Sequence, residues 1–407
     1  MIDIKKLREN SQPYQESAVR RGVEVDIEEL LKLDRDRAEL IQKSETLRSQ
    51  LKIDGKPTEE ELEALKVKKK EYESISKNLD KITSKYHDIL SQVPNLLAND
   101  TPDGDENNNR EERRWGKTEL QFEARDHVEL GEINNLFDFE AGAKVSGAKF
   151  YFTKDKMLRL WQAIELFAQN IVRKEGFEMM GVPHMVNYDV ASGTGYMPRG
   201  EENQNYIDSD QKLVLIATSE IPITGYHKDD VLDLAEPKLY AGLSPSYRLE
   251  AGAYGKFSKG LYRTHQFEKL EMYVFCHPDQ SNNWLQKIVE IEEKICQELN
   301  IPYRVVRIAA GDMSTPAYEK YDLEYFSPAE KDYRELTSCS NCTDFQARNL
   351  NIRYRTENGK LDYVHTLNGT TVVSSRMTIA ILENYQQVDG TVKIPEVLQK
   401  YYGAEVL

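Results

Sequence analysis

The clearest hydrophobic pattern in the chain lies in its N-terminal quarter. Between residues 65 and 93, apolar side chains recur at alternating steps of three and four, and only Lys68 interrupts the series formed by Leu65, Tyr72, Ile75, Leu79, Ile82, Tyr86, Ile89 and Val93. This spacing is typical of the seam of a coiled coil. A weaker seam with the same spacing covers residues 30–51, where its apolar members are Leu30, Leu33, Leu40, Leu47 and Leu51.

Turn and capping signals separate the two seams. Residues 54–57 read Asp-Gly-Lys-Pro, Thr58 and Glu61 form a capping box, and Asp26 is placed to cap the first helix. The pattern predicts two long helices folded back as an antiparallel arm over about residues 26–93. Taken alone, such an arm could be a dimerisation coiled coil, and its lysines at positions 66 and 68–70 could either contact phosphate or belong to a solvated face of mixed charge.

The pattern changes after Pro94. Residues 101–109 are polar and without periodicity, so we place a linker there and predict an N-terminal domain over residues 1–105 and a second domain over residues 106–407. Strand-like segments follow at 177–186, 212–217, 247–250, 265–275 and 303–308, with helices near 157–171, near 282–299 and after Asn368. This order predicts an α+β fold, an antiparallel β-sheet flanked by helices, with the helical arm at its N-terminus.

Composition excludes several classes of protein. No run approaches the roughly 18 apolar residues that span a bilayer, and the first residues resemble neither a signal nor a transit peptide, so we expect a cytoplasmic protein. A net charge of −15 argues against a protein that coats nucleic acid non-specifically, although a local basic strip stays open. Four cysteines are too few for a disulfide framework, and because Cys339 and Cys342 lack a second ligand pair, buried thiols are favoured over zinc.

Two glycine-rich segments do not fit the nucleotide-binding motifs that they approach. Residues 252–258 lack the spacing of a phosphate-binding loop, and residues 193–195 lack the third glycine of the dinucleotide fingerprint. Residues 256–259 (Lys-Phe-Ser-Lys) resemble a loop of the synthetases built on a parallel sheet, but the chain has no His-x-Gly-His partner motif. That class is disfavoured.

Two segments of residues 246–276 carry the candidate chemistry. On a strand, Arg248 and Glu250 would share one face; on the returning strand, Phe267, Lys269 and Glu271 share a face, with Leu270, Met272 and Val274 on the other. An arginine fork can stabilise charge on a phosphate, an aromatic ring can stack on a purine, and carboxylates can accept from amines and hydroxyls. The polar face is therefore the candidate site, although Arg-x-Glu alone could be a surface ion pair.

In combination, these segments resemble motif 2 of the seryl-tRNA synthetases, in residues 247–253 (Tyr-Arg-Leu-Glu-Ala-Gly-Ala) and 260–271 (Gly-Leu-Tyr-Arg-Thr-His-Gln-Phe-Glu-Lys-Leu-Glu). Residues 181–183 (Gly-Val-Pro) resemble motif 1, whose proline lies at the dimer interface in class II synthetases. Residues 367–376 resemble motif 3, with Asn-Gly-Thr-Thr where the family often has Asn-Gly-Ser-Gly. Residues 218–220 and 335–348 also match, and the resemblance to the bacterial form extends over the whole chain.

The resemblance implies a homodimeric enzyme that activates L-serine with ATP and transfers the seryl group to the 3′ end of tRNA(Ser); whether tRNA(Sec) is also a partner stays open, and no membrane is implied. The catalytic residues would be Arg248, Glu250 and Arg376. Serine would be bound by Thr218, Ser219, Glu220, Arg248, Glu271 and Thr370. ATP would be bound by Arg248, Leu249, Glu250, Phe267, Glu335, Leu336, Thr337, Ser338 and Arg376. Mg²⁺ would be held by Glu335 and Ser338.

This chemistry requires positioning and charge stabilisation rather than a catalytic histidine, so we interpret His265 and His365 as structural. Two alternatives remain. An amino-acid:carrier-protein ligase on the same catalytic body would lack the helical arm, whereas this chain has one. An inactive tRNA-binding paralogue would have lost arginines or glutamates of the motifs, and none is missing.

Overall fold

The computed structural model describes residues 1–52, 58–196, 205–208, 210–250 and 260–407. The chain divides into two compact units, Met1–Leu96 and Leu97–Leu407. No helix within the described ranges is long and apolar enough to cross a bilayer.

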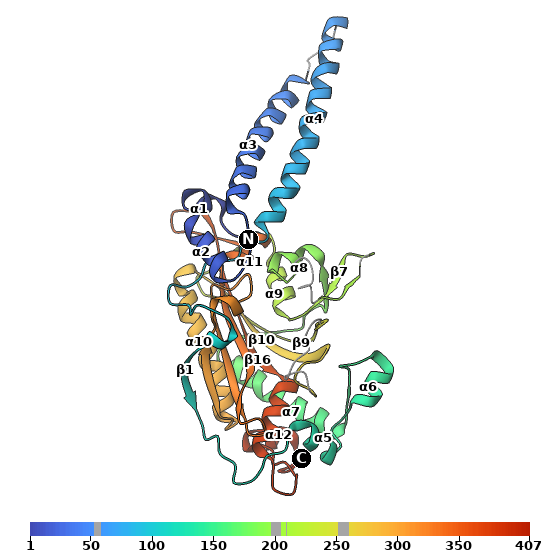
Figure 1. Cartoon of the computed structure of the whole chain (residues 1–407), viewed down its shortest axis with the longest axis vertical. Helices are drawn as coiled ribbons and strands as arrows, with labels where there is room; N and C mark the ends of the chain where they lie inside the picture. Colours follow the sequence, from blue (N-terminus) through green and yellow to red (C-terminus); the bar gives the residue numbers. More distant parts are fainter. Residues whose placement is uncertain (53–57, 197–204, 209, 251–259) are drawn as a thin grey trace. The chain divides into compact units, whose positions relative to one another are not determined.

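The first unit is a helical arm on a small helical base. Its helices are α1 (Ile4–Glu9), α2 (Gln12–Arg20), α3 (Ile27–Gln50) and α4 (Glu59–Leu90), and α3 and α4 lie side by side (Figure 1). Lys85 near the end of α4 pairs with Glu29 at the start of α3, 2.6 Å between Nζ and Oε1, so the two helices are antiparallel. The Asp26 carboxylate caps α3 by accepting from the amide of Glu29 at 2.8 Å, as predicted.

Both predicted seams lie on the shielded side of the helix pair. Every seam position from residue 65 to 93, and every position of the weaker seam from residue 30 to 51, is buried or partly buried, while most positions between them are exposed. The antiparallel arm is therefore confirmed. The predicted turn at residues 54–57 lies outside the described residues.

The second unit is built on an eight-stranded sheet in the order β1-β11-β12-β13-β16-β10-β9-β4. All of its neighbours pair antiparallel except β4 and β9. The strands are β1 (Arg110–Trp115), β4 (Glu178–Met180), β9 (Lys238–Tyr247), β10 (Gln266–Cys276), β11 (Tyr303–Arg307), β12 (Glu319–Ser327), β13 (Asp332–Thr343) and β16 (His365–Val373).

Helices cover the sheet and bury its apolar face. The main hydrophobic core joins side chains of α7 (Asp155–Lys174), α10 (Ser281–Glu298), α12 (Ser374–Tyr385) and α13 (Glu396–Tyr402) to the central strands. Shorter helices and strands surround this core: α5 (His127–Asn134), α6 (Phe139–Ser146), α8 (Tyr188–Thr194), α9 (Glu220–Tyr226), α11 (Phe345–Leu350), β2 (Phe137–Asp138), β3 (Phe152–Thr153), β5 (Met185–Asn187), β6 (Ile207–Asp208), β7 (Leu213–Leu215), β8 (Val231–Leu232), β14 (Arg353–Arg355) and β15 (Leu361–Tyr363). The predicted α+β fold is confirmed.

Several predicted elements have different bounds, and three of the differences bear on the site. The first strand of the motif 2 hairpin is β9, which ends at Tyr247, so residues 248–250 are not a strand. The segment 177–186 holds two short strands, β4 and β5, in different sheets. The helix expected directly after Asn368 begins only at Ser374, because residues 365–373 pair with β10 and β13 as strand β16. Pairing between strands distant in the sequence decided these bounds, and local patterns do not report it.

Within the described residues, three β-bulges interrupt the central strands. One makes Cys342 an extra residue of β13 where that strand pairs with β16. On β13, Glu335 pairs with Glu324 and Thr337 pairs with Leu323, so Leu336 is an extra residue. On β16, Thr370 pairs with Glu271 and Val372 pairs with Leu270, so Thr371 is an extra residue. A bulge inserts one residue and thereby reverses the alternation of faces beyond it.

All four cysteines, Cys276, Cys296, Cys339 and Cys342, are buried, as expected for thiols of a packed core. Within the described ranges, no group of three or more histidine, cysteine or acidic side chains is arranged to hold a metal ion on its own.

Candidate active site

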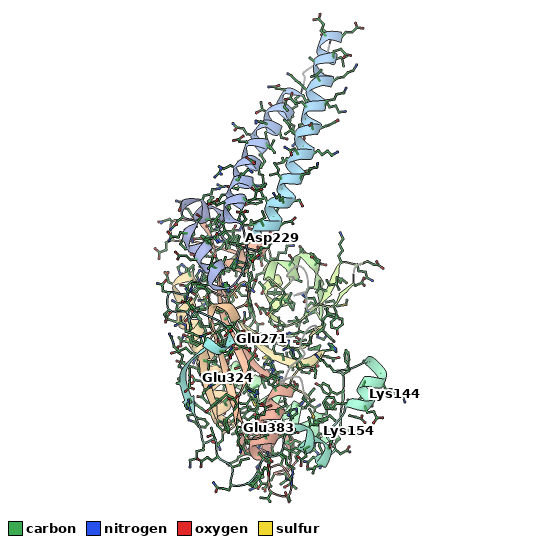
Figure 2. All side chains as sticks on the ribbon, viewed as in Figure 1. Lys144, Lys154, Asp229, Glu271, Glu324 and Glu383 are labelled. Carbon is green, nitrogen blue, oxygen red and sulfur yellow. The ribbon has the colours of Figure 1, made fainter. Side chains whose placement is uncertain are left out.

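A cavity of about 540 Å³ lies over the polar face of the central strands. Most of the residues predicted for the site line it: Glu220, Arg248, Glu250, Phe267, Glu271, Glu335, Leu336, Thr337, Ser338, Thr370 and Arg376. Figure 2 labels Glu271 and Glu324, which belong to β10 and β12 of this sheet. Residues that lie far apart between positions 220 and 376 are thus brought to one cavity.

Strand β10 presents one polar and one apolar face, as predicted. Phe267, Lys269 and Glu271 line the cavity. The intervening Leu270 and Met272 are fully buried in the hydrophobic core. The period-2 pattern of the strand therefore separates the site from the core.

Arg248 and Glu250 reach the cavity from a segment that follows β9. The guanidinium carbon of Arg248 lies 5.2 Å from the centroid of the Phe267 ring, and its Nε donates to the carbonyl of Ala217 at 3.4 Å. Glu250 has a φ of 46° and pairs with Arg263. The prediction that Arg248 and Glu250 share one face of a strand is wrong, but both side chains still line the cavity. The rest of the glycine-rich segment, residues 251–259, lies outside the described residues.

Glu220, at the start of α9, is a buried carboxylate held by three side-chain hydrogen bonds. It is 2% exposed, and it accepts hydrogen bonds from Tyr196 Oη at 2.7 Å, Gln346 Nε2 at 2.7 Å and Asn368 Nδ2 at 3.0 Å. Burial, together with the nearby charge of Glu271, raises the pKa of Glu220. A buried carboxylate with these neighbours is suited to receive a cationic group of a small ligand.

A second buried acid, Glu271, lies beside it on β10. Glu271 pairs with Lys269, accepts from Thr218 Oγ1 at 3.4 Å and lies directly across from Thr370 of β16. Burial lowers the pKa of Lys269, although the Glu271 charge opposes that shift. An acid, a base and two hydroxyls therefore meet at this end of β10.

The opposite part of the cavity pairs Arg376 of α12 with Glu335 of β13. Arg376 Nη1 lies 2.9 Å from Glu335 Oε1, and its guanidinium lies 4.8 Å from the centroid of the Tyr262 ring. Burial alone would raise the pKa of Glu335, but the charges of Arg376 and Lys320 lower it to about 2. Glu335 is therefore ionised across the accessible pH range.

Three predicted residues do not line the cavity: Thr218, Ser219 and Leu249. Thr218 lies just behind it, where its hydroxyl accepts from the amide of Glu220 at 3.2 Å. Ser219 donates to the carbonyl of Gly242 at 3.0 Å, which ties α9 to β9. Of those that do line it, Leu336 also belongs to the core, and the Thr337 hydroxyl bonds to Glu292 of α10.

Sequence reasoning did not assign roles to several residues that line the cavity: Tyr196, Tyr262, Arg263, Lys269, Lys320 and Asn368. Tyr262, Arg263, Lys269 and Asn368 stand within the quoted motifs, so their positions were available. Tyr196 and Lys320 lie in segments without a motif, and no local signal pointed to them. His265 and His365 bond to Arg248 O at 3.0 Å and Ser281 Oγ at 2.9 Å, in keeping with structural roles.

Comparison with known proteins gives the same picture. Residues 1–97 match the family model "Seryl-tRNA synthetase N-terminal domain", and residues 203–385 match "tRNA synthetase class II core domain (G, H, P, S and T)". The serine–tRNA ligase of Dictyoglomus thermophilum is 44% identical, with 99% of this chain and 98% of that protein covered.

Solved structures agree over the full length. The crystal structure of a seryl-tRNA synthetase from Pyrococcus horikoshii complexed with ATP has a TM-score of 0.90 and 36% identity, covering 100% of this chain and 99% of that one. The cytoplasmic serine–tRNA ligase of Naegleria fowleri in complex with AMP has a TM-score of 0.83 and 29% identity, covering 98% and 95%. The chain therefore belongs to the seryl-tRNA synthetase family of class II aminoacyl-tRNA synthetases.

Proposed function

We propose that this chain is a serine–tRNA ligase, which activates L-serine with ATP and transfers the seryl group to the 3′ end of tRNA(Ser). The observation that carries the proposal is the convergence of Arg248, Phe267, Glu271 and Arg376 on one cavity in a chain that is 44% identical to a serine–tRNA ligase over 99% of its length. The same cavity holds Glu220 beside the acid–base pair of β10.

In the first step, a carboxylate oxygen of serine attacks the α-phosphorus of ATP, the bond to the bridging oxygen breaks, and pyrophosphate leaves. Arg248 would hold the α-phosphate and stabilise the charge that develops there, and the Phe267 ring would stack on the adenine, which Glu250 would contact at its amine. Arg376 would bind the γ-phosphate. In the second step, a terminal ribose hydroxyl of tRNA attacks the acyl carbon, and AMP leaves.

The serine side chain would be recognised by its hydrogen bonds. Glu220 would lie at the ammonium group, with Thr218 supporting it from behind, and Glu271 and Thr370 would lie at the hydroxyl. Alanine would leave Glu271 and Thr370 unpaired in a buried space, so it is rejected, because unpaired buried polar groups are costly. Threonine would be excluded by the size of the cavity.

The residues present fit an Mg²⁺ ion that accompanies ATP. The bulge at Leu336 brings Glu335 and Ser338 to the same face of β13, and Glu335 carries a fixed negative charge. A carboxylate and a hydroxyl, completed by phosphate oxygens, are the hard ligands that Mg²⁺ prefers. When bound, the ion would neutralise charge on the phosphates.

The N-terminal arm supports a role in reading tRNA. We assign residues 1–105 as the tRNA-binding domain and residues 106–407 as the catalytic domain. The long helices α3 and α4 would grip the long variable region of the tRNA through its shape and phosphates rather than its bases. A tRNA(Sec) of similar shape would then be a second substrate.

Two further assignments accompany the proposal. The exposed residues Gly181 and Pro183, which resemble motif 1, favour a homodimer through this segment. A cytoplasmic location is assigned by analogy with the Naegleria fowleri relative, which is a cytoplasmic serine–tRNA ligase.

The decisive test is serine-dependent exchange of labelled pyrophosphate into ATP, run with each of the twenty amino acids. Only serine should support rapid exchange in the parent protein. Arg248→Ala should abolish exchange, because the reacting phosphate loses its cationic partner, while Arg355→Ala, at an exposed arginine of β14, should leave exchange unchanged. Full exchange by Arg248→Ala would refute the role of Arg248.

Deletion of residues 26–93 with a short linker tests the arm. Exchange should persist, and charging of tRNA(Ser) should fall by orders of magnitude. Undiminished charging would show that the arm does not read the tRNA. Transfer of serine to a carrier protein but not to tRNA by the full chain would instead favour the carrier-protein ligase.

A further inference from the structure

Glu292 of α10 is a buried carboxyl group behind the active-site sheet, and the proposed mechanism does not use it. It is 1% exposed, and its Oε2 accepts a hydrogen bond from Thr337 Oγ1 at 2.7 Å. Its other oxygen, Oε1, has no hydrogen-bond partner among the residues that the structure describes. Burial raises the pKa of Glu292 well above its ordinary value.

The hydrogen-bond partner of Glu292, Thr337, lies next to the bulge of β13. Thr337 directly follows Leu336, the extra residue of the β13 bulge, and pairs with the core residue Leu323 of β12. Its hydroxyl therefore points away from the cavity, toward α10. Glu292 thus contacts β13 at the place where the alternation of its side chains is reversed.

The close packing of α10 on the sheet allows Glu292 to reach this place. Helix α10 packs against β13 and β16, beside the sheet in Figure 1. A Cβ atom at Gly369 of β16 would lie 2.1 Å from Ile288 Cγ2 and 3.1 Å from Glu292 Oε1, so the approach requires a glycine there. The acid is held against β13 and β16, two of the strands that carry proposed ligand-binding residues.

A polar pair in this apolar layer has an energetic cost that a leucine and a valine would avoid. One of the two carboxyl oxygens has no partner among the described residues, and leaving such an atom buried costs about 1–3 kcal/mol. A leucine–valine pair could not provide the directional hydrogen bond that Glu292 and Thr337 form. Without a fixed point, a strand can slip by one residue, and every side chain beyond the slip then moves to the opposite face.

We propose that Glu292 is a positioning residue for ATP binding: its hydrogen bond with Thr337 holds the bulge of β13 in place and thereby keeps Glu335 and Ser338 together on the cavity face. The inference deepens the proposed function and rests on it. Glu292 itself touches neither substrate. Its effect passes through the backbone of residues 335–338 to the nucleotide.

The test measures binding of Mg²⁺ with a non-hydrolysable ATP analogue by calorimetry, without serine and without turnover. Thr337→Val keeps the shape of the side chain but removes the donor, and Glu292→Ala removes the acceptor. Each should weaken nucleotide binding about tenfold, the value of one well-formed hydrogen bond. Glu292→Gln retains an acceptor oxygen for the Thr337 hydroxyl and should stay within about threefold of the parent protein.

Cys296→Ala provides a matched control, because Cys296 is a buried residue one turn further along α10. It should lower the melting temperature without changing nucleotide affinity, and serine affinity should be unchanged in every variant. If Glu292→Ala fails to fold, Thr337→Val decides the matter.

Three results would overturn the inference: parent-like nucleotide affinity in Thr337→Val, an equal loss in Glu292→Gln and Glu292→Ala, or an equal loss in the Cys296→Ala control. Failure of the parent protein itself to bind the nucleotide or to catalyse serine-dependent exchange would overturn the proposed function, and the inference with it. Serine-dependent exchange by the parent protein therefore distinguishes failure of the inference from failure of the proposed function.

Discussion

The side chains of Glu335 and Ser338 lie on the same face of β13, although three positions separate them and a regular strand would place them on opposite faces. The bulge at Leu336 removes this conflict, because Glu335 pairs with Glu324 while Ser338 pairs with Asp322. Both residues consequently line the cavity. A local irregularity of one strand thus assembles the proposed metal and phosphate site.

Deletion of Leu336 tests this account. Without the extra residue, Glu335 and Ser338 stand two positions apart on a regular strand and still share the cavity face, so pyrophosphate exchange should persist at a temperature where the variant is folded. Leu336→Ala keeps the bulge and serves as the control. It should cost about 2–5 kcal/mol of unfolding free energy through the cavity that it creates, yet retain exchange at a temperature where it is folded. Loss of exchange in the deletion variant alone would contradict this account.

Serine binding should depend on pH through Glu220. Burial and Glu271 raise the pKa of Glu220, and only the ionised carboxylate attracts the ammonium group of serine. As the pH falls through this raised pKa, the carboxylate gains a proton, so the KM for serine should rise at a pH where an ordinary glutamate is still ionised.

Glu335, in the same cavity, provides an internal reference for the pH dependence of serine binding. Glu335, with a pKa of about 2, stays ionised over the same range, so binding of the Mg²⁺–ATP analogue should change much less. Glu220→Gln should bind serine weakly at every pH and show no such dependence. A parent-like pH profile in that variant would assign the titration to another group.

Removal of one member of the buried pair on β10 should be costly. Lys269→Met leaves Glu271 as an unpaired charge in a site where both residues are nearly inaccessible, and loss of one partner of such a pair costs about 3–5 kcal/mol. The double variant Lys269→Met with Glu271→Leu should recover most of that free energy in chemical denaturation. It should not recover exchange, because the proposed contact to the serine hydroxyl is absent; recovered exchange would argue against that contact.

Tyr196→Phe should weaken serine binding without changing ATP binding. The phenol donates to Glu220 at 2.7 Å, and hydrogen bonds to charged groups contribute about 1.5–3 kcal/mol, so the KM for serine should rise roughly tenfold or more. The pH at which serine binding is lost should also move upward, because the carboxylate loses a donor that favours its ionised form. Tyr226→Phe, at a tyrosine that is 61% exposed, should change neither quantity.

The sequence by itself determined the features that depend on local periodicity. The seams predicted the arm because a coiled-coil repeat requires only that each helix bury one stripe, and the alternation in residues 266–276 separated Phe267, Lys269 and Glu271 from the core. The motif residues, including Arg248 and Arg376, identified the family. These signals are carried by neighbouring residues and do not require knowledge of distant contacts.

Only the tertiary structure decided how the site is assembled. The bulges at Leu336 and Thr371 and the end of β9 at Tyr247 depend on pairing between strands. The hydrogen bonds of Tyr196 and Gln346 to Glu220 likewise join segments that are far apart in the chain. Strand register results from the packing of whole elements against one another, and one extra residue reverses the face of all residues beyond it. Local patterns therefore predicted which residues matter on β10, while the faces of Glu335 and Ser338 depended on pairing with β12.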